Sequence, residues 1–215
     1  MTQVVLDTAG TRLDADVEVP EGAVGVVLFA HGSGSSRHSP RNRAVAAELN
    51  RRGLATVLMD LLTADEDSPV DERARFDVGL LAGRLAGAVD RVGDDPATEH
   101  LPVGLFGAST GGAAAMVAAA ARPHTVRAVV SRGGRPDLAG AVLAQVIAPT
   151  LLVVGEYDAL VADLNHRALA LLGARAELRV VPGASHLFEE PGTLEQVAVA
   201  AADWFTSALP RTPRG

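Results

Sequence analysis

The feature that most constrains the fold of this chain is a regular alternation of short apolar runs with segments long enough for helices. The runs are rich in Val and Leu, which is typical of strands buried on both faces. Such alternation predicts an α/β fold with a mostly parallel sheet and helices on both faces. The expected strands are Val24–Phe29, Leu54–Met59, Val103–Phe106, Val126–Ser131, Leu151–Val154 and Glu177–Val181, and the expected helices span 41–52, 73–92, 110–121, 138–146, 161–172 and 194–209.

Two shorter strands, 3–6 and 15–19, precede this pattern, with a turn at Gly10 between them. Because no helix separates them, we expect them to add antiparallel strands at one edge of the sheet. The acidic stretch 61–72 predicts an exposed loop. Helix ends are expected at Gly53, Gly93, Pro123 and Gly173.

The 215 residues predict a single domain over 1–215 with a loose tail over 209–215. Hydrophobic residues make up 48% of the chain but aromatic residues only 3%, so the core must consist mainly of Ala, Val and Leu.

Charge and composition exclude several classes of protein. The net charge of −7 argues against nucleic acid as a partner, because phosphate binding needs a basic surface. The chain has no Cys, which excludes disulfides, thiolate metal sites and a cysteine nucleophile. All 19 basic residues are Arg, which excludes a lysine Schiff base and a P-loop lysine. Neither a signal peptide nor a membrane-spanning run is visible, so a cytoplasmic protein is expected.

Reactive residue types follow the ends of the expected strands. Open α/β sheets place their sites at the carboxyl ends of the strands. The segments at these ends are His31–Ser36, Gly107–Gly111, Arg132–Arg135, Gly155–Asp158 and Pro182–Phe188. The sequence therefore predicts a functional site at one end of the sheet.

The segment Gly107–Gly111 fits the pattern G-x-S-x-G, with Ser109 at its centre. It lies directly between an apolar strand and a helix of small residues, which is where a nucleophile elbow must lie. We therefore expect Ser109 to be a catalytic nucleophile. The alternative is that Ser109 only caps the helix, a common function of serine.

A serine hydroxyl becomes a good nucleophile only when a neighbouring base takes its proton. His186 follows the last strand and is the expected base, whereas His31 is interpreted as structural. The base needs an acidic residue that orients it. Asp158 is expected in this role, and Glu156 in the same loop is the competing candidate.

An oxyanion hole needs two convergent backbone N–H groups. We expect the N–H of Thr110, which follows the nucleophile, and that of Ser33 in the glycine-rich segment His31–Ser36. The alternative for this segment is a phosphate cradle, but it lacks a G-K-[ST] ending.

These residues together resemble the dienelactone hydrolase family of the α/β-hydrolase superfamily. The matching segments are HGSGSS at 31–36, GASTGG at 107–112, GEYD at 155–158 and ASHLFEEPG at 184–192. The resemblance implies an α/β-hydrolase fold and an enzyme that cleaves a small-molecule ester or lactone through an acyl-enzyme, without a metal or cofactor. It also implies a triad of Ser109, Asp158 and His186.

One residue departs from the family pattern. The name-giving enzymes use cysteine at the position of Ser109. A carboxylesterase of unspecified substrate is therefore the expectation, rather than a hydrolase of dienelactone itself.

Only Gly133–Asp137 separate the strand ending near Ser131 from the next helix, so we expect no cap domain and an open site. Gly34, Arg37 and Arg132 are candidate substrate contacts, and with Arg135 these arginines would favour an anionic substrate. The alternative is that the arginines form structural ion pairs with the acidic loops.

Three other functions remain open from sequence. An acyltransferase or perhydrolase would use the same triad with another acceptor in place of water. A non-catalytic ligand-binding protein could use the same scaffold, and a nucleotide-binding regulator is the third alternative. The oligomeric state also stays open.

Overall fold

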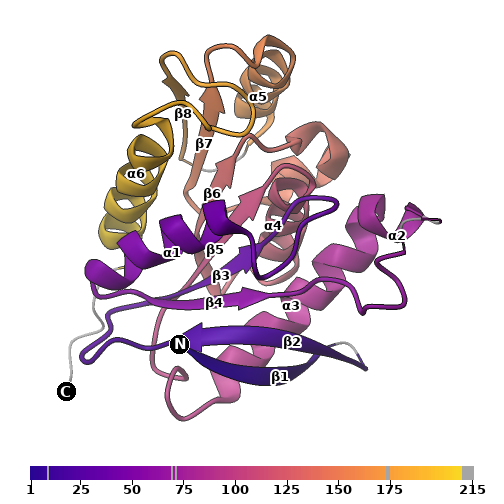
Figure 1. Ribbon diagram of the computed structural model, residues 1–215, viewed down its shortest axis with the longest axis vertical. Coiled ribbons are helices and arrows are strands. Elements are labelled where there is room, and N and C mark those ends of the chain that lie inside the picture. Colours follow the sequence, from indigo (N-terminus) through magenta and orange to yellow (C-terminus); the bar gives the residue numbers. More distant parts are fainter. Residues whose placement is uncertain (9, 69, 71, 173–174, 210–215) are drawn as a thin grey trace.

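The computed structural model describes residues 1–8, 10–68, 70, 72–172 and 175–209. Its centre is an eight-stranded sheet with the strand order β1-β2-β4-β3-β5-β6-β7-β8 (Figure 1). The strands are β1 (Thr2–Thr8), β2 (Thr11–Glu18), β3 (Val26–Ala30), β4 (Ala55–Met59), β5 (Val103–Ala108), β6 (Val126–Arg132), β7 (Thr150–Gly155) and β8 (Ala176–Val181).

The β1–β2 hairpin forms one edge of the sheet and pairs antiparallel with β4 through β2, whereas β3 to β8 pair in parallel. This arrangement confirms the predicted α/β fold and its antiparallel edge. The helices are α1 (Pro40–Arg51), α2 (Arg73–Phe76), α3 (Val78–Asp94), α4 (Thr110–Ala121), the 3₁₀ segment η1 (Pro136–Gln145), α5 (Ala159–Leu171) and α6 (Thr193–Ala208).

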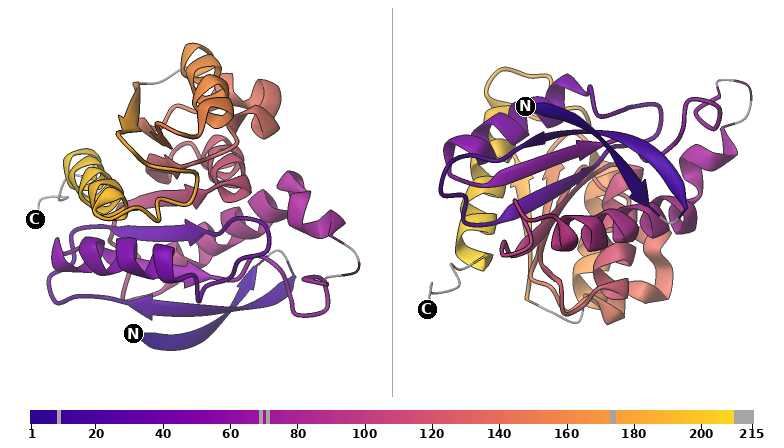
Figure 2. Two further views of the ribbon diagram at one scale, coloured as in Figure 1. Left: turned by 45° about the horizontal axis from the view of Figure 1, so that its top comes forward. Right: turned by 90° about the horizontal axis from the view of Figure 1, so that it is seen from below.

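Helices cover both faces of the sheet, as the alternating pattern predicts. Helices α1 and α6 lie on one side, and α3, α4 and α5 lie on the other (Figures 1 and 2). Each side has its own hydrophobic core. Phe29 and Phe106 pack against each other on the α1–α6 side, with ring centroids 4.9 Å apart and the ring planes tilted by 35°. The rest of both cores consists mainly of Ala, Val and Leu, as the composition requires.

Helix α4 explains why a run of Gly and Ala is useful here. Nine of its twelve residues are buried, because the sheet, α3 and η1 all pack against it. Small side chains let these neighbours approach on every side, whereas a typical surface helix buries only one stripe.

Several expected boundaries differ from the structure. The helix predicted over 73–92 is divided at Asp77, whose carboxylate accepts a hydrogen bond from the N–H of Leu80 and caps α3. The helix predicted over 138–146 is a 3₁₀ segment interrupted at Gly140, which has a φ of 54°. In the predicted exposed loop 61–72, Leu61 and Leu62 are buried and belong to the hydrophobic core on the α3–α4 side.

The structure also tests two further predictions, the absence of a cap domain after β6 and the loose C-terminal tail. Three residues, Gly133–Arg135, connect β6 to η1, so no cap domain is inserted there. Leu209 is buried against Gly25 and Gly104, so the expectation of a loose tail is wrong at this residue. The rest of the predicted tail, and the helix end predicted at Gly173, lie outside the described residues. No helix in the described part of the chain is long and apolar enough to cross a bilayer.

Candidate active site

The turn between β5 and α4 holds Ser109 in a strained backbone conformation. Its φ is 51° and its ψ is −122°, a region that side-chain-bearing residues rarely adopt. A Cβ at Gly107 would overlap the backbone of Gly111, and a Cβ at Gly111 would overlap the carbonyl oxygens of Ala30 and His31. Both glycines of the motif are therefore required by close backbone approach, and strain of this kind concentrates at functional sites.

The backbone of Ser109 is fixed while its hydroxyl is free. Its N–H donates to the carbonyl of Arg132 at 3.2 Å, and its own carbonyl accepts from the N–H groups of Gly112 at 2.9 Å and Arg135 at 3.1 Å. The hydroxyl makes no helix-capping hydrogen bond, so the capping alternative is wrong. It also bonds to no other described residue, which leaves its oxygen available for chemistry.

The loops after β7 and β8 bring His186 and Asp158 together. The Nδ1 of His186 lies 2.5 Å from Oδ2 of Asp158. The carboxyl side chain is 14% exposed and the imidazole 40% exposed. A carboxylate at Nδ1 favours the tautomer with its proton there, which leaves Nε2 able to accept a proton.

Glu156, the competing acid, has a different partner. Its carboxylate accepts a hydrogen bond from the N–H of Gly183 at 2.7 Å. Glu190 accepts from the N–H of Ser185 at 3.0 Å, and this bond lowers the pKa of the Glu190 carboxyl. The two glutamates thus stabilise the loop that carries His186 by accepting hydrogen bonds from two of its backbone N–H groups.

Two glycines in other loops contact the side chains of His186 and Ser109. A Cβ on Gly133 would lie 3.4 Å from Cε1 and 3.5 Å from Nδ1 of His186, and one on Gly32 would lie 3.1 Å from Cβ of Ser109. Gly133 directly follows Arg132, whose carbonyl binds the Ser109 N–H. No hydrogen bond joins Ser109 to His186 among the described residues, and such bonds often form only when a substrate is present.

Two N–H groups near Ser109 fit the predicted oxyanion hole. Those of Ser33 and Thr110 donate to no described residue. Thr110 begins α4, where N–H groups lack helical partners and the potential is positive. Gly34, the next residue after Ser33, has a φ of 69°, a backbone conformation that favours glycine.

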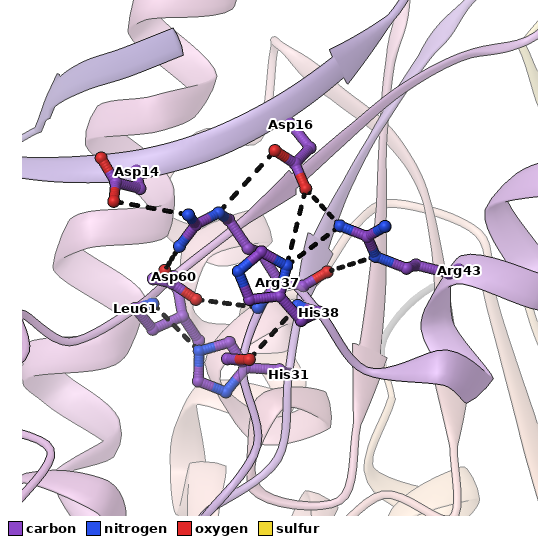
Figure 3. A network of polar contacts seen from close by, with 9 residues as sticks. Asp14, Asp16, His31, Arg37, His38, Arg43, Asp60 and Leu61 are labelled. Carbon is purple, nitrogen blue, oxygen red and sulfur yellow. Dashed lines mark hydrogen bonds and ion pairs between the residues drawn. The ribbon is translucent and has the colours of Figure 1, made fainter. Parts of the chain in front are cut away.

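A buried histidine holds this loop against β4. The Nε2 of His31 accepts a hydrogen bond from the N–H of Leu61 at 3.0 Å (Figure 3). Its Nδ1 bonds the carbonyl of Gly32 at 2.9 Å. Burial lowers the pKa of His31, so the ring stays neutral. The structure thus agrees with a structural role for His31.

Arg37 is enclosed by carboxylates. Its guanidinium pairs with Asp60, and lies 3.5 Å from Asp14 and 3.7 Å from Asp16 (Figure 3). Its backbone N–H donates to Asp60 at 2.8 Å. This geometry favours the structural ion pair over a substrate contact for Arg37. Asp60 was not singled out from sequence, although it directly follows an expected strand.

The other predicted arginines differ from each other. Arg135 forms a two-point ion pair with Asp137, at 2.8 and 2.7 Å, and is therefore also occupied. Arg132 is buried at the end of β6 and has no such partner among the residues that the structure describes. Within the described residues, no group of three or more His, Cys, Asp or Glu side chains is placed to hold a metal ion.

Glu66 stabilises the segment that follows β4, and its ion pair predicts a pH dependence of the free energy of unfolding. It pairs with the buried Arg84, which also donates to the carbonyl of Leu61 at 2.8 Å. The hydrogen bond from Arg84 lowers the pKa of Glu66 to about 2, below its usual 4.5. Because the folded-state pKa is depressed, the stabilisation is present above about pH 4.5 and is lost as the pH falls toward 2.

We expect Glu66→Gln to lower the free energy of unfolding at pH 7 by about 1 kcal/mol, since the carboxylate is 35% exposed and solvent screens the pair. Urea unfolding of both proteins from pH 7 to pH 2.5 checks this, and the difference should shrink with acidity. Glu72→Gln, at an exposed ion pair with Arg75, is the control and should change stability by less than about 0.5 kcal/mol. A difference that is constant over this pH range would contradict the assignment.

Known proteins match both the sequence and the fold. Residues 23–204 match the model of the alpha/beta hydrolase domain family. A crystal structure of dienelactone hydrolase from Anabaena variabilis is 56% identical, with a TM-score of 0.93, over 96% of this chain and 97% of that one. A serine hydrolase without a lid from Xanthomonas campestris has a TM-score of 0.79 at 22% identity, over 99% of this chain and 96% of that one, and shows the fold alone.

Two Mycobacterium tuberculosis proteins, provisionally named phosphoribosyl transferases, are 59% identical over 192 residues, which is 89% of this chain. The match covers 43% of their length, so this chain spans less than half of those relatives. The family model and the Anabaena structure both extend over most of the chain and include the Ser109 elbow and the Asp158 and His186 loops. This chain therefore belongs to the α/β-hydrolase family, with a dienelactone hydrolase among its similar structures.

Proposed function

We propose that this chain is a serine hydrolase that cleaves a carboxylic ester or lactone through an acyl-enzyme. The observation that carries the proposal is the strained Ser109, whose backbone bonds the end of β6, the same strand end where Gly133 lies against the ring of His186, itself paired with Asp158. The similarity to a dienelactone hydrolase supports the same reaction class.

The first half-reaction forms the acyl-enzyme. The Oγ of Ser109 attacks the ester carbonyl carbon while Nε2 of His186 takes the hydroxyl proton. Asp158 stabilises the resulting imidazolium, and the N–H groups of Ser33 and Thr110 hold the negative oxygen. When the bond to the leaving group breaks, His186 returns its proton to the departing alcohol.

The second half-reaction repeats these steps with water. His186 takes a proton from water, the resulting hydroxide attacks the acyl carbon, and the proton returns to Oγ as the acid leaves. An alcohol or hydrogen peroxide in place of water would make the same triad an acyltransferase or a perhydrolase. Product analysis with competing acceptors separates these reactions.

Covalent labelling tests the proposal directly. A fluorophosphonate should modify wild-type protein at Ser109, located by mass spectrometry, and Ser109→Ala should take no label. Ser35→Ala is the matched control, because Ser35 lies at the same end of the sheet and its hydroxyl bonds to no described residue. It should label like the wild type.

Absence of labelling would contradict the proposal. Folded wild-type protein that takes no label would show that the triad does not assemble, and would favour the non-catalytic ligand-binding alternative. Labelling without turnover of short-chain p-nitrophenyl esters in water would favour transfer to another acceptor.

A further inference from the structure

Arg132 is a buried cation beside the nucleophile. It is the last residue of β6 and is only 7% exposed. Its carbonyl accepts a hydrogen bond from the N–H of Ser109 at 3.2 Å. The hydroxyl of Ser131 lies toward Gly112 on the α4 side of the sheet, whereas Val130 belongs to the α1–α6 core. Because side chains alternate along a strand, Arg132 points to the α1–α6 side of the sheet, beside the elbow.

No carboxylate of the described residues compensates this charge. Nη1 of Arg132 is fully buried without a hydrogen-bond partner, and the guanidinium forms no ion pair in the described part of the chain. Arg37, Arg84 and Arg135 each pair with a carboxylate instead. Burying an unpaired charge is costly, so a folded protein rarely retains one without a function.

A second guanidinium adds to the positive charge. Arg41 lies in the first turn of α1, and its Nε is buried without a partner in the described residues. Its Nη1 lies 3.5 Å from the exposed carboxylate of Glu189. Burial, and then the charge of Arg41, lower the pKa of Arg132 to about 10, so Arg132 remains cationic at neutral pH.

Two cations that repel each other need an anion between them to become stabilising. The fork of a guanidinium matches two oxygens of a carboxylate or a phosphate. The backbone of Arg132 bonds that of the nucleophile, so the residue that carries this guanidinium lies directly beside the Ser109 elbow.

We propose that Arg132 and Arg41 bind an anionic group, a carboxylate or a phosphate, on the ester that Ser109 cleaves. The proposal rests on the proposed function, and it makes the preferred substrate an anionic ester. Arg37 and Arg135 do not belong to this subsite, because carboxylates of the protein already occupy them.

A matched pair of substrates tests the subsite. 4-Nitrophenyl pentanoate and the mono-4-nitrophenyl ester of glutaric acid have acyl chains of equal length, and only the second ends in a carboxylate. At constant ionic strength, the wild type should show a kcat/KM at least tenfold higher for the anionic ester. Arg132→Gln and Arg41→Gln should each lower this ratio by roughly 10- to 100-fold, the range for losing a hydrogen bond to a charged group.

The controls separate this proposal from the proposed function. Arg135→Gln removes a paired guanidinium at the same edge and should leave the ratio unchanged. If Arg132→Gln fails to fold, the more exposed Arg41→Gln still tests the subsite. Wild-type protein that hydrolyses both esters equally, with a ratio that neither variant changes, would overturn the subsite and leave the hydrolase proposal standing.

Binding provides a readout that does not need turnover. Glutarate and inorganic phosphate should each be tested as stabilisers in thermal unfolding, and the anion with the larger effect identifies the source. We expect a rise in Tm that Arg41→Gln abolishes. If the wild type hydrolyses neither ester, the hydrolase proposal fails, whereas absence of any Tm shift with both anions overturns the subsite.

Discussion

Asp158→Asn should lower kcat for ester hydrolysis by roughly 10⁴-fold, with little change in the fold. The carboxylate faces Nδ1 of His186 at 2.5 Å, so it favours the tautomer in which Nε2 can accept the proton of Ser109. An amide can present its NH₂ to Nδ1 instead, which favours the wrong tautomer and does not stabilise an imidazolium. Steady-state kinetics with a short-chain p-nitrophenyl ester measures the loss.

Glu156→Gln is the matched control for this experiment. Glu156 lies two residues away and accepts from the N–H of Gly183, a bond that the glutamine oxygen can also make. We expect a loss of less than about tenfold, because only a neutral hydrogen bond replaces a charge-assisted one. Kinetic losses in the reverse order would identify Glu156 as the orienting acid.

Gly111→Ala should destabilise the folded state by at least about 3 kcal/mol, and much of the protein should be insoluble. The new Cβ would overlap the carbonyl oxygens of Ala30 and His31, which are backbone atoms of β3 and the loop after it. Neither can move aside as a flexible side chain could. Thermal or urea unfolding of the soluble fraction measures the effect.

Gly83→Ala is the control for a glycine in a helix. It lies on the exposed side of α3, and a Cβ there meets no atom within 4 Å. Alanine should therefore raise the free energy of unfolding by up to about 1 kcal/mol through its better helix propensity. A Gly111→Ala protein with wild-type Tm would contradict the close approach of α4 to β3.

Local patterns were sufficient for the architecture. Apolar runs of strand length and the helix-length segments between them predicted the parallel sheet, its antiparallel edge and the bounds Thr110–Ala121 of α4. The reason is that the period of apolar residues depends on a few neighbours in the chain. The same period could not show the break at Asp77. The residues on both sides of Asp77 are compatible with one continuous helix, but its side chain caps α3 and so begins a new helix there.

The loops of the candidate site were found for a related reason. In a parallel sheet, the carboxyl ends of the strands meet at one edge, so the loops of Ser109, Asp158 and His186 had to converge there. Convergence of the loops does not distinguish Asp158 from Glu156 as the orienting acid. Both occupy one loop, and only the folded chain shows that the first faces His186 and the second faces Gly183.

The sequence pattern could not show which arginines are paired with carboxylates. Arg37, Arg132 and Arg135 follow strands in similar sequence surroundings, yet Arg37 meets carboxylates of β2 and of the residue after β4, and Arg135 meets Asp137. Arg132 meets no carboxylate among the described residues. The fold class follows from the chain's local periodicity, and Arg135 meets a carboxylate only two residues away. The carboxylates around Arg37 depend instead on strand order and register, because these bring together residues that are distant in sequence.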